Sequence, residues 1–167
     1  MRLRKARPSD ALRGQAISAP TQSTWRVLVV VTTSQVLIDT GPLVALYDRK
    51  DQHHNKCAEA ASEIAQPAYT CWPVITEAAY LLRDFEHAVR DMLSKIEKGE
   101  LRLMTLGSLD ASGINAILDK YRFGFADSCL MYLAEREDIL TVFTVDYRHF
   151  SLYRTANGKS LRLLPEN

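Results

Sequence analysis

Short apolar runs alternate with segments of helical periodicity along most of the chain. The apolar runs predict strands over residues 36–39, 69–71, 101–106, 139–145 and 161–164. Between them, apolar residues recur at intervals of three and four, which predicts helices over residues 41–47, 54–65, 73–82, 86–98, 109–121 and 126–136. Pro73 is well placed to open one of these helices and Gly99 to end another. This alternation is typical of an α/β fold with a central, mostly parallel sheet flanked by helices.

The first 35 residues differ in character from the rest. They carry six basic residues and one acid, a net charge of +5, whereas the remaining 132 residues carry 15 basic and 19 acidic residues, a net charge of −4. We therefore expect a basic leader over residues 1–35 and one folded domain over residues 36–167. The leader's composition fits a disordered segment, a transit-like peptide or an over-extended gene start, and residues 27–32 within it could add an edge strand.

The composition argues against a membrane segment, a disulfide scaffold and a zinc site. An apolar share of 47% is sufficient for a core, and no apolar stretch is long enough to cross a bilayer, so we expect no membrane segment. Cys57, Cys71 and Cys129 are widely spaced and odd in number, which argues against a disulfide scaffold and a zinc site. We expect three small buried side chains and a cytoplasmic location.

Two carboxylates follow predicted strands directly. Asp39 comes after the apolar run at residues 36–38, and Asp146 comes after the run that ends at Val145. In open α/β sheets, ligands bind at the carboxyl ends of the strands. If the two strands are parallel neighbours, the two acids point into one crevice.

Two further carboxylates come from predicted helices. Glu77 follows Val74 by three residues and precedes Leu81 by four, so we expect it on an apolar face, where a charge needs a cation or hydrogen bonds. Asp127 lies in the first turn of its helix and can face the same crevice. Four acids without an obligatory His or Cys suit hydrolysis at phosphorus with Mg²⁺ or Mn²⁺, which prefer carboxylate oxygen.

Each acid also has a purely structural interpretation. Asp127 could complement the helix macrodipole, Asp146 could cap the segment that follows it, and Glu77 could pair with Arg83. Asp39 is the hardest to explain in this way, because it puts a charge directly after a buried run. The four acids together, in this order, make the stronger case for a site.

The motifs that contain these acids resemble those of PIN domains. The resembling segments are Val36-Leu37-Ile38-Asp39-Thr40, Val74-Ile75-Thr76-Glu77, Phe125-Ala126-Asp127 and Thr144-Val145-Asp146, and the likeness extends from about residue 36 to residue 165. The residues after Asp146 are similar to those of bacterial VapC-like members. The resemblance implies a three-layer fold and a metal-dependent endoribonuclease, the toxin of a VapBC-like toxin–antitoxin pair, often homodimeric and blocked by its cognate antitoxin.

The same resemblance implies roles for individual residues. It makes Asp39, Glu77, Asp127 and Asp146 the catalytic acids that hold Mg²⁺ or Mn²⁺, with water as the nucleophile. Thr144, and more weakly Thr40, would orient the site. Gly41 departs from the family pattern, since many relatives have Ser or Asn there. The loop after Asp146 offers Tyr147 and Arg148 rather than a fifth acid, so we expect four acids and leave the number of metal ions open.

Contacts with RNA are less well defined by the sequence. The basic candidates for phosphate contacts are Arg49, Arg148 and Arg154, with Lys50, His53, His54 and Arg83 as further possibilities, and each could equally be a solvated surface residue.

The sequence also has features of three other classes of protein. Asp39-Thr40-Gly41 matches the Asp-Thr-Gly of retroviral-type aspartic proteases, but those are all-β dimers and this chain is rich in helical periodicity. A receiver domain lacks support because no paired acids follow an early strand. A non-catalytic PIN-like module that binds RNA or protein stays the main alternative, although such a module gains nothing from gathering carboxylates that repel one another.

Overall fold

The structure is a computed structural model that describes residues 35–65 and 67–166. Its strands are β1 (Val36–Ile38), β2 (Ala68–Thr70), β3 (Leu101–Leu103), β4 (Thr141–Phe143) and β5 (Arg162–Leu164). Its helices are α2 (Thr40–Tyr47), α3 (His54–Glu63), α4 (Trp72–Leu81), α5 (Ala88–Glu97), α6 (Ala111–Tyr121), α7 (Phe125–Arg136) and α8 (Tyr147–Phe150). Except for Gln35, the predicted leader lies outside the described residues, as does the possible strand at residues 27–32.

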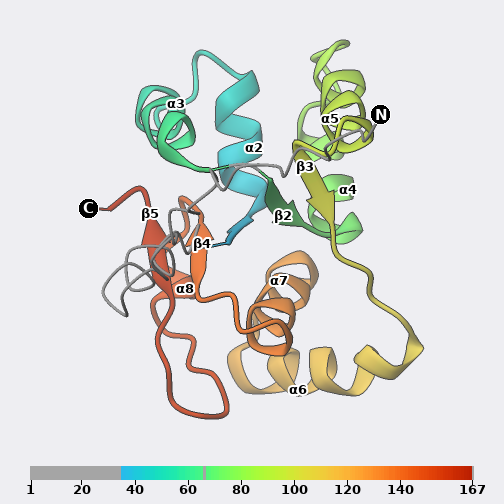
Figure 1. Cartoon of the computed structure of the whole chain (residues 1–167), viewed down its shortest axis with the longest axis vertical. Coiled ribbons are helices and arrows are strands. Elements are labelled where there is room, and N and C mark those ends of the chain that lie inside the picture. The colour runs from blue at the N-terminus through green and yellow to red at the C-terminus, as the bar shows by residue number, and fades with distance from the viewer. Residues whose placement is uncertain (1–34, 66, 167) are drawn as a thin grey trace, which may run out of the picture. The chain divides into compact units, whose positions relative to one another are not determined.

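The five strands form one sheet in the order β3-β2-β1-β4-β5, and every neighbouring pair is parallel. Figure 1 shows α2, α3 and α5 on one side of this sheet and α6 and α7 on the other. Helix α4 contacts both α2 and α7. The predicted α/β architecture with helices flanking a parallel sheet is therefore confirmed, and the sheet is wholly parallel.

The strand order places β1 at the centre of the sheet. All three residues of β1 and all three of β4 are buried, as expected of strands covered on both faces. Their register aligns Ile38 with Phe143, so the residues that follow, Asp39 and Thr144, leave the sheet side by side. The buried core continues through the helices, and Cys57, Cys71 and Cys129 lie within it as free thiols, as predicted.

Helix ends follow the local signals in the sequence. Asp39 has extended backbone and its side chain accepts a hydrogen bond from the Thr40 amide at the start of α2. Pro73 stands in the first turn of α4, and Gly99 adopts φ +76° just beyond α5, which suits a residue without a Cβ. These two predicted boundaries are confirmed.

Some predicted elements differ from the observed ones. The strand predicted over residues 139–145 is limited to Thr141–Phe143, and the helix predicted from residue 109 begins at Ala111 after a 3₁₀ turn at Ser108–Asp110. The short helix α8 was not predicted, because four residues are too few to show a helical period. In the described part of the chain, no helix is both long and apolar enough to span a bilayer.

Candidate metal and catalytic site

Asp39 is the most deeply buried of the four predicted acids, with only 4% of its surface exposed. It joins the end of β1 to the start of α2, and both of its carboxylate oxygens accept hydrogen bonds. Oδ1 accepts from the backbone amide of Thr40 at 2.7 Å, and Oδ2 accepts from the Thr144 hydroxyl at 2.7 Å. The carboxylate is therefore held in a single orientation at the carboxyl end of the central strand.

Thr144 connects this carboxylate to the next acid along the sheet edge. It is fully buried at the end of β4, and its Oγ1 also accepts a hydrogen bond from the Asp146 amide at 3.0 Å. One hydroxyl group thus positions both Asp39 and the backbone of Asp146. Thr144 lies where the sequence predicted an orienting hydroxyl.

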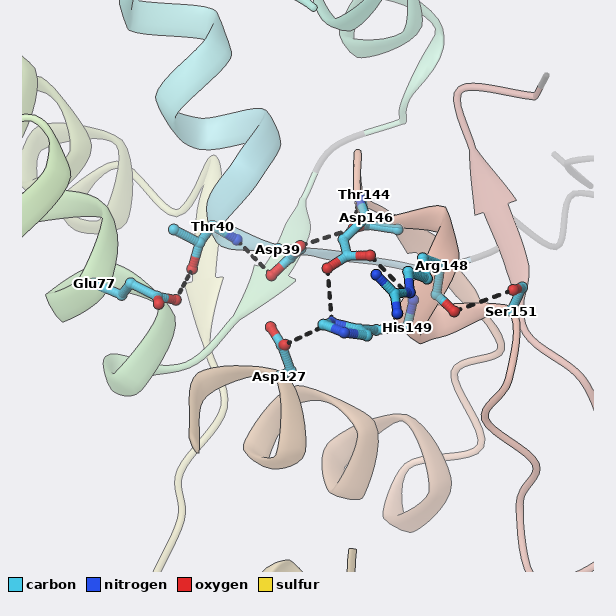
Figure 2. A network of polar contacts seen from close by, with 9 residues as sticks. All are labelled: Asp39, Thr40, Glu77, Asp127, Thr144, Asp146, Arg148, His149 and Ser151. Atoms are coloured by element: carbon cyan, nitrogen blue, oxygen red, sulfur yellow. Dashed lines mark hydrogen bonds and ion pairs between the residues drawn. The ribbon is translucent and has the colours of Figure 1, made fainter. Parts of the chain in front are cut away.

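Asp146 caps a helix as well as lying near the other acids. Its Oδ1 accepts a hydrogen bond from the His149 amide at 3.0 Å and so caps helix α8. Its Oδ2 is directed toward the space between Asp39, Asp127 and His149, which we call the crevice, and lies close to the ring of His149 (Figure 2). The capping role that the sequence left open and a role at the site are therefore compatible, because different oxygens serve them.

Asp127 reaches the same crevice from the opposite side. It lies in the first turn of α7, whose next turns bury Met131 and Ala134 against the core. Figure 2 shows its carboxylate directed toward the space between Asp39, Asp146 and His149. The predicted convergence of helical and strand-end acids thus holds for Asp127.

Glu77 differs from the expectation. Glu77 is exposed, and Leu81 one turn later is exposed as well. The helix face that carries Glu77 is therefore not the buried apolar face that was predicted. The prediction that Glu77 lies on the buried face was wrong, because α4 buries the adjacent face that carries Val74 and Ala78. Glu77 is nevertheless tied to the site, since its Oε2 accepts a hydrogen bond of 2.8 Å from the Thr40 hydroxyl.

The electrostatics of the crevice reflect crowded negative charge. The pKa of Asp39 is raised to about 7, mainly by burial and also by the neighbouring charges of Asp127 and Glu77, against the lowering effect of its hydrogen bonds to Thr144 and Thr40. Burial also raises the pKa of Asp127, with the charges of Glu77 and Asp146 acting in the same direction. Carboxylates in this state attract either protons or cations.

His149 was missed as a site residue. Its Nδ1 lies 2.7 Å from Oδ2 of Asp146 and 3.8 Å from Oδ2 of Asp127, and its ring packs on Phe123 at a centroid distance of 5.0 Å. His149 follows Asp146 by three residues, and residues three apart in a helix lie on the same face. This spacing could have indicated that the two side chains are neighbours. That signal was unusable because α8 itself was not predicted.

The donor atoms fit a divalent cation. One oxygen each of Asp127 and Asp146 and a ring nitrogen of His149 all lie within 4.8 Å of one another. Asp39 and Glu77 stand outside this closest group, but their charges act on it. Clustered carboxylate oxygens are the ligands that Mg²⁺ and Mn²⁺ prefer.

The three arginines predicted to contact RNA lie in different surroundings. Arg148 is exposed on α8 beside His149, close to the acids (Figure 2). Arg154 is exposed, but its guanidinium donates hydrogen bonds to the carbonyl groups of Ser151 and Tyr153, each at 2.6 Å. Arg49 is exposed in the turn after α2. Only Arg148 of these three is adjacent in sequence to the acid cluster.

Known proteins are similar to this chain in sequence and in fold. Residues 36–156 match the PIN domain family. Ribonuclease VapC26 of Mycobacterium tuberculosis (strain ATCC 25618 / H37Rv) is 30% identical to this chain over 138 residues, and the match covers 78% of this chain and 100% of that relative. The crystal structure of Mycobacterium tuberculosis VapC20, a sarcin-ricin loop cleaving toxin, has a similar fold, with a TM-score of 0.56 and 17% identity over 65% of this chain and 87% of that one. The chain belongs to the PIN domain family.

Proposed function

We propose that this chain is a metal-dependent endoribonuclease that hydrolyses RNA phosphodiester bonds. The observation that carries the proposal is the convergence of Asp39, Asp127 and Asp146, from two strand ends and one helix, on a single crevice (Figure 2). The similarity to Ribonuclease VapC26 over the whole length of that relative supports RNA as the substrate. Residues 36–167 would form the nuclease domain, and the basic leader would be separate from it.

The residues of the crevice have distinct tasks in this proposal. Asp127 and Asp146, with support from Asp39 and Glu77, would hold Mg²⁺ or Mn²⁺. When bound, such a cation would activate water toward phosphorus and neutralise charge on the phosphate oxygens. Thr144 and Thr40 would keep the Asp39 and Glu77 carboxylates in place, which limits the reorganisation needed when substrate arrives.

Phosphate recognition would come from the rim of the crevice. Arg148 is exposed beside the acids, so its guanidinium can pair with a phosphate next to the scissile bond. Arg49 and Arg154 would add weaker contacts along the backbone of the RNA. The domain has a net negative charge, so basic side chains near the site are needed to attract the negatively charged RNA.

The likeness to VapC proteins also bears on partners. We propose that the chain is the toxin of a VapBC-like pair, that it forms a homodimer, and that a cognate antitoxin blocks the crevice. The molar mass of the purified chain, measured by light scattering with and without a co-expressed candidate antitoxin, tests both associations. A monomer that binds no such partner would contradict them without affecting the nuclease proposal.

The nuclease proposal is tested with end-labelled total RNA and the purified full-length chain in Mg²⁺, in Mn²⁺ and in EDTA. We expect discrete cuts with either metal ion, no cuts in EDTA, and no cuts by Asp39→Asn. Asp119→Asn is the matched control, since Asp119 is an exposed acid on α6, and it should cut like the wild type. If wild-type chain that is folded by circular dichroism cuts no RNA with either ion, the proposal fails in favour of a binding module.

A further inference from the structure

His149 offers the crevice a nitrogen donor in addition to its carboxylates. Its Nδ1 is shielded from solvent and has no hydrogen-bond partner in the described part of the chain. At 2.7 Å from Asp146 Oδ2 the contact is too poorly aligned for a hydrogen bond, and Asp127 Oδ2 lies on the other side at 3.8 Å. A ring nitrogen that is shielded from solvent, makes no hydrogen bond and is directed at two carboxylates needs a physical explanation.

The spacing of these atoms matches a shared cation. Ligands at about 2.1 Å from one metal ion lie roughly 3 Å apart when adjacent and about 4.2 Å apart when opposite. The two distances from Nδ1, 2.7 Å and 3.8 Å, are close to this range, and all three donor atoms lie within 4.8 Å of one another. A small movement of the side chains is therefore sufficient to place all three around one ion.

The ring is also held in this position. Phe123 packs against it at 5.0 Å, and Phe123 in turn stacks on Tyr121 at 5.1 Å with the two planes 11° apart. The Asp146 cap fixes the first turn of α8, which carries His149 three residues later. A nitrogen donor that is positioned in advance binds a cation without a large loss of side-chain entropy.

We infer that His149 is a ligand of the metal ion through Nδ1, so that the site is Asp127, Asp146 and His149 supported by Asp39 and Glu77. This inference rests on the proposed function in placing a divalent cation in the crevice. If His149 is a ligand, the site should discriminate between metal ions. Imidazole suits transition metals, whereas Mg²⁺ prefers oxygen ligands, so His149 favours Mn²⁺ over Mg²⁺.

The test measures metal binding rather than cleavage. Isothermal titration of the metal-free full-length chain with Mn²⁺ and with Mg²⁺ compares wild type, His149→Gln and His149→Phe. The phenylalanine variant keeps a ring against Phe123, and His87→Gln is the matched control because His87 is exposed before α5. We expect both His149 variants to weaken Mn²⁺ binding by about tenfold or more, with less than about a threefold change for Mg²⁺.

Pulsed electron paramagnetic resonance of the Mn²⁺-loaded chain gives an independent readout. A coupling to ¹⁴N should be present in the wild type and in His87→Gln, and absent from both His149 variants. Unchanged Mn²⁺ affinity in the His149 variants, or a wild type without the ¹⁴N coupling, would overturn the inference. Tighter Mn²⁺ binding in the variants would also overturn it, because the imidazole would then be a cation that competes for the site.

Failure of the inference and failure of the proposed function can be told apart. A chain that binds Mn²⁺ with ¹⁴N coupling but cuts no RNA retains the ligand assignment and loses the nuclease proposal. A chain that cuts RNA with Mn²⁺ but shows no coupling retains the nuclease proposal and loses the ligand assignment.

Discussion

Thr144 on the end of β4 donates a hydrogen bond of 2.7 Å to Asp39 at the end of β1, and 105 residues separate the two in the chain. The bond is buried, and when Asp39 is ionised it is charge-assisted and so stronger than one between neutral groups. It exists because β1 and β4 are parallel neighbours in register. The pairing of β4 with β1 therefore positions the Asp39 carboxylate at the end of the central strand.

The first prediction concerns this hydroxyl group. Thr144→Val keeps the shape of the side chain but removes the donor to Asp39 and the acceptor for the Asp146 amide. We expect RNA cleavage to fall by about 10- to 100-fold, as for other groups that orient ligands. Thr144→Ser, which restores the hydroxyl, should recover most of the rate. Equal rates for all three proteins would show that the bond is not needed.

The second prediction concerns stability and pH in the absence of metal. Since the pKa of Asp39 is about 7 in the folded chain and 3.8 is its ordinary value, the folded state holds a proton that the unfolded state releases. The free energy of unfolding should therefore fall as pH rises from about 4 to about 7, by about 2–4 kcal/mol from this group. Urea denaturation in EDTA measures it.

Asp39→Asn isolates that contribution. The amide oxygen can accept one of the two hydrogen bonds that Asp39 accepts, and the amide cannot ionise, so the variant should lose less stability over the same pH range. Above pH 7 it should be more stable than the wild type in EDTA. Parallel pH profiles for the two proteins would show that Asp39 ionises normally.

The third prediction concerns metal binding as a source of stability. A cation that binds only the folded chain raises stability by about 2.7 kcal/mol at 100 times its dissociation constant, so Tm should rise by several degrees with Mn²⁺ and return with EDTA. Asp127→Asn should lose most of this rise. Glu77→Gln should lose less, because Glu77 is exposed and stands outside the closest donor group. A larger loss for Glu77→Gln would reverse that ranking.

The fourth prediction concerns Gly41, which lies in the first turn of α2 beside Val145. A Cβ at this position would overlap the side chain of Val145, so Gly41→Ser forces a shift where α2 meets the end of β4. We expect a loss of about 1–3 kcal/mol in the free energy of unfolding. The control is Gly107→Ser, since a Cβ there would meet no atom closer than 3.9 Å. The double variant Gly41→Ser with Val145→Ala should recover part of the loss.

Much of the fold follows from local pattern. The run Val36-Leu37-Ile38 is buried as a central strand, and Asp39 lies at its carboxyl end, because an apolar run before a charge has few other solutions in an α/β chain. The helix starts and ends at Pro73 and Gly99 follow from their backbone preferences. Asp127 lies in the first turn of α7 as expected, one turn before the buried Met131.

Other features depend on tertiary contacts that a local pattern does not encode. Which face of α4 is buried is decided by its packing against both α2 and α7, and so the orientation of Glu77 was predicted wrongly. Helix α8 has too few residues for a period, so His149 could not be placed beside Asp146. The bond between Thr144 and Asp39 depends on strand order, which only the assembled sheet defines.

We propose that the acid cluster uses a divalent cation to direct water at an RNA phosphodiester. The chemistry of the product ends tests this mechanism most directly, with a 5′-labelled RNA cut by the full-length chain in Mn²⁺. Attack by water leaves linear phosphate ends, so we expect products without 2′,3′-cyclic phosphate and no cleavage in EDTA or by Asp127→Asn. Cyclic phosphate ends, or cleavage that persists in EDTA, would contradict it.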